Sequence, residues 1–146
     1  MNEEQKQKVA ALLKDQHVLV IATQGEEWPT TTMQAFGETE ELDIIVIMAN
    51  AAEKYLNLTK NPKVTVHVDT RDKGIAGFQV VRASIRGLAR EVPKDSDEWN
   101  QLKSKFLKKN PFEEPFFARD TLRMISIAPK RIEYANGLSE AFIETL

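Results

Sequence analysis

Cysteine is absent from the 146-residue sequence. This absence excludes disulfides, thiol catalysis and cysteine metal sites, and it is typical of a cytoplasmic protein. There is no apolar run near the roughly 20 residues that a membrane helix needs. The first residues are polar and acidic, unlike a secretory signal. With 20 basic and 22 acidic residues the net charge is −2, so neither nucleic acid nor a membrane is an expected partner.

Other signatures of chemistry are also missing. The two histidines, His17 and His67, do not have metal-ligand spacing, so no metal site is expected. We interpret His67 as an exposed or hydrogen-bonded strand residue. No serine–histidine–acid pattern, Walker loop or dinucleotide glycine fingerprint is visible. Asp69, Arg71 and Asp72 have the pattern of a solvated turn. The residues alone therefore assign no catalytic group.

The composition, 42% hydrophobic and 29% charged, predicts one folded domain over residues 1–146. Apolar periodicity and helix stop signals predict helices over 3–16, 53–60 and 97–109, and a weak helix after Gly137. Alternating or β-rich runs predict strands over 17–23, 28–36, 42–48, 63–70, 78–91, 122–128 and 131–134. Residues 111–120 form an aromatic loop that should dock on an apolar surface. Short turns between the early strands favour a mainly β, antiparallel barrel with flanking helices.

The junction within "IVIMANAAEKYLNLTKNP", residues 45–62, raises the possibility of a ligand site. A strand buried on both faces leads into a short helix, which Asn61-Pro62 ends. The free N–H groups at a helix start favour phosphate. Lys54 is the only cation at this junction, and Glu53 precedes it.

Four segments, in order, carry a resemblance to a known family. They are "VLVIAT" followed by a strand entered at Pro29, "AAEKYLNLTKNPKVTVHV", "RASIRGLAREV" with its Gly87 and Ala89, and "RMISIAPKRIEYAN". Over roughly residues 5 to 134 the chain resembles the FMN-binding split barrels of the pyridoxamine 5′-phosphate oxidase-like superfamily.

The resemblance implies an antiparallel six-stranded split β-barrel that forms a homodimer, with cofactor sites at the subunit interface. Most characterised members bind FMN, some bind the deazaflavin F420, and a few relatives bind haem. Carried over by position, the cofactor-binding residues are Thr31, Thr32, Met33 and Gln34 along the ring and ribityl chain, Ala49 and Asn50 through their backbone, Lys54 at the phosphate, and Arg82 from an adjacent strand.

The sequence departs from the family pattern at the phosphate. Met48 and Ala52 stand where the family has hydroxyls, Glu53 where a basic residue is frequent, and Thr32 where the oxidases have a cation. Arg82 and Arg86 share a strand face and either compensate or pair with neighbouring acids. The threonines at 30–32 either line the ligand or reflect β propensity, and Gln34 either bonds a flavin ring edge or faces solvent.

Two functions are consistent with this pattern. The first is an FMN-binding oxidoreductase of unknown substrate. The alternative is a non-catalytic split-barrel dimer with a degraded phosphate site that binds F420, haem or no ligand. Pyridoxamine phosphate oxidase proper is not expected, because an "RRxRxxP"-like end is absent and Arg131 alone does not replace it.

Overall fold

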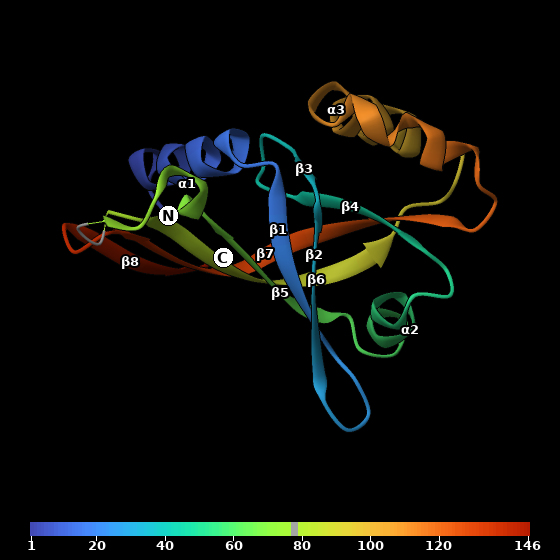
Figure 1. The fold of residues 1–146 in the computed structure, drawn as a ribbon, viewed down its shortest axis with the longest axis horizontal. Coiled ribbons are helices and arrows are strands. Elements are labelled where there is room, and N and C mark those ends of the chain that lie inside the picture. Colours follow the sequence, from blue (N-terminus) through green and yellow to red (C-terminus); the bar gives the residue numbers. More distant parts are fainter. Residues whose placement is uncertain (77–78) are drawn as a thin grey trace.

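A curled antiparallel sheet with helices along its sides dominates the computed structural model, which describes residues 1–76 and 79–146 (Figure 1). The helices are α1 (Glu3–Asp15), α2 (Glu53–Lys60) and α3 (Asp97–Lys109), with 3-10 helices η1 (Arg71–Lys73) and η3 (Pro111–Ala118). The strands are β1 (Val18–Gln24), β2 (Pro29–Ala35), β3 (Gly37–Glu38), β4 (Ile44–Ala49), β5 (Lys63–Asp69), β6 (Val81–Glu91), β7 (Leu122–Asn136) and β8 (Glu140–Thr145).

The strands follow the order β2-β1-β5-β6-β7-β4-β3, and β8 pairs with β7 outside this path. All pairs are antiparallel, and the sheet curls into a half-barrel of the split-barrel type. The predicted mainly β architecture with flanking helices is confirmed. Six long strands form the predicted barrel, and the described residues add the two-residue β3 and the terminal β8.

Three local predictions are corrected. Residues after Gly137 form strand β8 instead of a helix, since Phe142 lies opposite Tyr134 and stacks on its ring at 4.8 Å. Residues 122–136 form one strand instead of two, because a bulge accommodates Pro129 opposite Gly87. The strand predicted to begin at Phe78 starts at Val81, and residue 78 itself lies outside the described residues.

Strand β4 separates two groups of buried side chains. Ile44, Val46 and Met48 pack with α1 and strands β1, β5 and β6, whereas Ile45 packs with Trp99, Leu102 and Phe106 of α3. This explains the continuous apolar run and confirms its burial on both faces. The predicted cap of α3 is also present, because Ser96 Oγ accepts from Trp99 N at 3.1 Å.

The aromatic segment after α3 docks as expected, but as a 3-10 helix. In η3 the ring of Phe117 lies 6.1 Å from Trp99 and 6.1 Å from Phe106, in edge arrangements. These contacts hold η3 beside the end of β4. In the described part of the chain, no helix has the length and hydrophobicity needed to cross a membrane.

Candidate functional site

A cavity of about 360 Å³ lies where β2, β4, α3 and η3 meet. Of the predicted cofactor residues, Met33 and Gln34 from β2 and Ala49 from β4 line it. Its remaining wall is largely apolar and comes from Ala35, Ile47, Met48, Phe106, Phe116 and Leu122, with Thr121, Glu113 and Arg119 adding polar groups. The sequence did not point to the η3 residues, since their contribution depends on how that segment docks.

Gln34 bridges the two sides of the open barrel. Its Nε2 donates to Ile47 O of β4 at 3.1 Å, although β2 and β4 are not neighbours in the sheet. Its Oε1 is buried and has no hydrogen-bond partner among the described residues. An unsatisfied buried acceptor costs free energy, so a ligand with an N–H or O–H donor would gain by reaching it. The half-buried Gln34 side chain, with its Oε1 buried, does not simply face solvent.

Lys54 and Thr32 form a polar pair at the start of α2. Lys54 Nζ donates to Thr32 Oγ1 at 3.3 Å. Partial burial lowers the pKa of Lys54, and no acidic side chain within residues 1–76 and 79–146 forms an ion pair with it. The N-cap residue Ala52 provides no side-chain hydrogen bond, so the first amides of α2 also lack a side-chain acceptor. This combination favours an anion.

The threonine run alternates across β2. Thr30 and Thr32 face α2, where Asn57 Nδ2 donates to Thr23 Oγ1 at 3.1 Å and to Thr30 Oγ1 at 3.3 Å. Thr31 is exposed. Asn57 was not predicted from sequence, yet it fixes α2, and therefore Lys54, against the strands that hold Thr32.

The other predicted residues lie elsewhere. Asn50 N donates to Thr121 O at 2.8 Å, in the turn after β4. Arg82 lines a separate cavity of about 490 Å³ with Ser84, Tyr134 and Phe142. Arg86 lines a third one. Within one chain, Arg82 and Arg86 therefore do not converge on a single cavity, and Arg82 does not line the one beside β2 and β4.

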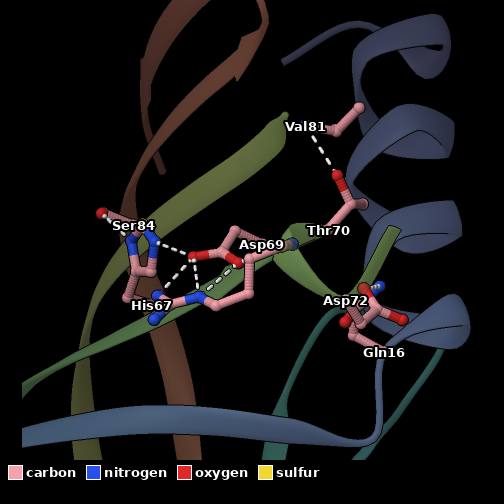
Figure 2. A network of polar contacts seen from close by, with 8 residues as sticks. Gln16, His67, Asp69, Thr70, Asp72, Val81 and Ser84 are labelled. Atoms are coloured by element: carbon pink, nitrogen blue, oxygen red, sulfur yellow. Dashed lines mark hydrogen bonds and ion pairs between the residues drawn. The ribbon is translucent and has the colours of Figure 1, made fainter. Parts of the chain in front are cut away.

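A serine–histidine–aspartate chain, not visible in the sequence, crosses strands β5 and β6 (Figure 2). His67 Nδ1 lies 2.9 Å from Ser84 Oγ, and His67 Nε2 lies 2.9 Å from Asp69 Oδ2. Strand register creates it, because His67 pairs directly with Ser84 while Asp69 shares the face of His67. His67 is thus hydrogen-bonded, as one interpretation predicted. None of the three residues lines the cavity beside β2 and β4.

Asp69 corrects the prediction of a solvated turn. Its side chain is 8% exposed and accepts from Arg71 Nε at 2.8 Å and Arg71 Nη2 at 2.6 Å. These hydrogen bonds hold the pKa of Asp69 well below its ordinary value of 3.8. The ionised carboxylate consequently stabilises the folded state above that value, and the stabilisation disappears as the pH falls below it.

Replacing Asp69 by asparagine should therefore make the free energy of unfolding depend less on pH in the acid range. Between about pH 6 and pH 3, the native protein should lose roughly 1 kcal/mol more unfolding free energy than Asp69→Asn, because at pH 3 the unfolded carboxyl is mostly protonated while the folded one is still ionised. Urea unfolding at several pH values measures this, with the exposed Asp120→Asn as the control that should follow the native protein. Equal acid sensitivity of Asp69→Asn and the native chain would contradict the assignment.

The curled sheet with its open seam and adjoining cavity defines a split β-barrel protein. The family model for pyridoxamine 5′-phosphate oxidase matches residues 5–136, and the chain belongs to this family. No curated protein matches the sequence.

Several solved structures share the fold. The heme binding protein from Mycobacterium smegmatis has a TM-score of 0.88 at 14% identity, covering 99% of this chain, which in turn spans 59% of that protein. HutZ, the heme storage protein from Vibrio cholerae, has a TM-score of 0.79 at 17% identity, covering 92% of this chain and 97% of its own. General Stress Protein 26 from Bacillus anthracis has a TM-score of 0.68 at 18% identity, covering 98% and 99%.

Proposed function

We propose that the protein binds FMN in the cavity between β2 and β4 and acts as a small flavin-dependent oxidoreductase. The observations that carry the proposal are a buried acceptor that lines this cavity and a cation that lies beside β2 at the start of α2. Lys54 is a half-buried cation without an acidic partner in the described chain, and Gln34 Oε1 is a buried acceptor without a donor. FMN has an anionic phosphate for the first and a ring N–H for the second.

The residues present fit such a cofactor. Lys54 Nζ, Thr32 Oγ1 and the first amides of α2 would hold the phosphate. Met33, Gln34 and Ala49 would lie along the ring and ribityl chain and exclude water from one side. When bound, the flavin supplies the redox chemistry, while the protein orients it. The lost hydroxyls at Met48 and Ala52 should weaken binding, since charge-assisted hydrogen bonds contribute roughly 1.5–3 kcal/mol each.

The proposed assembly is a cytoplasmic homodimer with its cofactor sites at the interface. Arg82 lines a cavity separate from the one beside β2 and β4, so we assign its predicted cofactor contact to the second copy of the dimer. Exposed apolar side chains on β1, β2 and β8, namely Val18, Met33 and Ile143, are compatible with such a contact.

The alternative is a non-catalytic split barrel that binds haem, F420 or no ligand. The two haem-related structural neighbours favour haem among these. Against it, neither histidine lines the cavity beside β2 and β4, and His67 already bonds Ser84 and Asp69.

The absorption spectrum of the purified protein separates the FMN proposal from these alternatives. Flavin bands, before or after incubation with FMN, would support the proposal. A Soret band on haem addition would support the alternative. The absence of both bands would indicate a protein that binds neither cofactor.

Lys54→Ala provides the sharper test of the FMN proposal. The variant should bind FMN at least tenfold more weakly, a loss of about 1.4 kcal/mol. Quenching of flavin fluorescence on titration measures the dissociation constant. Lys60→Ala is the matched control, because Lys60 lies on the same helix with an exposed side chain that forms an ion pair with Glu26. Unchanged affinity in Lys54→Ala would place the phosphate elsewhere.

A further inference from the structure

Four cationic side chains surround a concavity of about 580 Å³ on the outer side of the sheet. Lys63 comes from β5, Arg86 from β6, and Lys130 and Arg131 from β7. Among the described residues that line it, none is acidic. Since the whole chain carries a net charge of −2, this concentration of positive charge is local.

Strand register forces two of the cations together. Arg86 lies directly opposite Arg131, an arrangement of like charges that destabilises a sheet. The bulge beside Gly87 leaves Lys130 unpaired in the β6–β7 ladder, so that Lys130 and Arg131 both line the concavity. The positive charge of Arg131 is offset by an ion pair with Glu133. Arg86, Lys63 and Lys130 form no ion pair within residues 1–76 and 79–146.

The floor of the concavity can receive an organic group. Ala22 and Leu88 offer apolar surface, and Thr65 and Gln24 add hydrogen-bonding side chains. Two arginine forks bind phosphate oxygens in pairs, and further lysines favour a dianion over a single carboxylate. None of these residues lines the cavity beside β2 and β4, so the concavity is distinct from the proposed cofactor site.

We propose that this concavity is a second ligand site, which binds a small molecule carrying a phosphate ester through Arg86, Arg131, Lys130 and Lys63. It has no role in the proposed flavin site and does not depend on it. The like-charge pair persists because a bound dianion neutralises it. The concavity is smaller than a duplex or an extended polynucleotide would need, which favours a small molecule.

Titration of the full chain with inorganic pyrophosphate tests the site. Amide resonances of Thr65, Gly87 and Lys130 should shift and saturate, and potassium chloride at equal ionic strength should not reproduce the shifts. Arg86→Gln and Lys130→Gln should each weaken binding about tenfold or more, the scale of one charge-assisted hydrogen bond. Lys105→Gln, an exposed lysine of α3, is the matched control and should bind like the native protein.

A second readout does not require the ligand. Arg86→Gln should unfold at the same or a higher temperature than the native chain, because it removes the repulsion with Arg131. The proposal is overturned if pyrophosphate produces no saturable shifts at these residues, if chloride gives the same response, or if Lys105→Gln weakens binding as much as Arg86→Gln. Lys54→Ala should still show the pyrophosphate-induced shifts at Thr65 and Lys130. The proposal for this site and the proposal for the flavin site can therefore be contradicted independently of each other.

Discussion

Replacing Lys109 by methionine should lower the free energy of unfolding by about 3 kcal/mol, near the lower end of the range for breaking a buried ion pair. Lys109 is 11% exposed and donates to Glu38 Oε2 and to Leu13 O, both at 2.7 Å. Its ammonium also lies 3.7 Å from the centre of the Phe36 ring. Burial lowers the pKa of Lys109 while Glu38 opposes that shift. One side chain thus joins the ends of α1 and α3 to β3, and methionine leaves Glu38 and Leu13 O without their donor.

A double-mutant cycle separates the ion pair from lost packing. The double variant Glu38→Gln/Lys109→Met should lose less unfolding free energy than the sum of the two single variants. This is because the second change no longer leaves a buried charge without its partner. Lys105→Met, on the exposed side of the same helix, should stay within about 0.5 kcal/mol of the native protein. If both lysine changes cost the same in urea unfolding, the buried pair does not stabilise the fold.

Gly87→Ala should cost about 2–3 kcal/mol, the upper part of the range for forcing an added methyl into a packed site. A Cβ at this position would lie 2.6 Å from Ile127 Cγ2 and 2.7 Å from Ala128 O. The carbonyl belongs to β7 and cannot rotate away as a side chain would. These contacts lie at the bulge where Gly87 pairs with Pro129, and the close approach of β7 requires glycine here.

Leu88→Ala is the control for Gly87→Ala because Leu88 is the next residue of the same strand and is 40% exposed. It should cost less than about 1 kcal/mol, since much of its side chain already contacts water. Urea unfolding of both variants, analysed with the same dependence of unfolding free energy on urea concentration, measures the difference in stability. A Gly87→Ala variant as stable as Leu88→Ala would mean that β7 moves to make room.

Much of the fold could be predicted because its local signals agree with its tertiary structure. The run at residues 44–48 is apolar throughout, and both of its faces are buried. Ser96 and Asn61-Pro62 mark helix ends through chemistry that acts within a few residues. Strand β8 could not be predicted in this way. Its pairing with β7 and the stacking of Phe142 on Tyr134 join it to the sheet, and neither contact is encoded in its own periodicity.

The candidate site also has parts that could be predicted from the sequence and parts that could not. Met33, Gln34 and Ala49 could be predicted to share a cavity because the resemblance fixes the positions of β2 and β4. The chain from Ser84 through His67 to Asp69 could not, since it arises from the register of two strands and not from sequence spacing. Arg82 shares a face with Arg86 as predicted, yet the distance along the strand places the two guanidinium groups in different cavities.

The seam that Gln34 spans has a consequence for how this site tolerates sequence change. Strand β2 ends the sheet on one side, and among the described residues the part of β4 beyond Ile45 has only β7 as its ladder partner. Each strand therefore presents main-chain amides and carbonyls toward the gap, and these groups are the same whatever side chain the residue carries. Side chains without a hydroxyl, such as those of Met48 and Ala52, leave this main-chain surface in place. Side-chain changes at the rim of this gap can accordingly alter its chemistry while these main-chain groups stay in place.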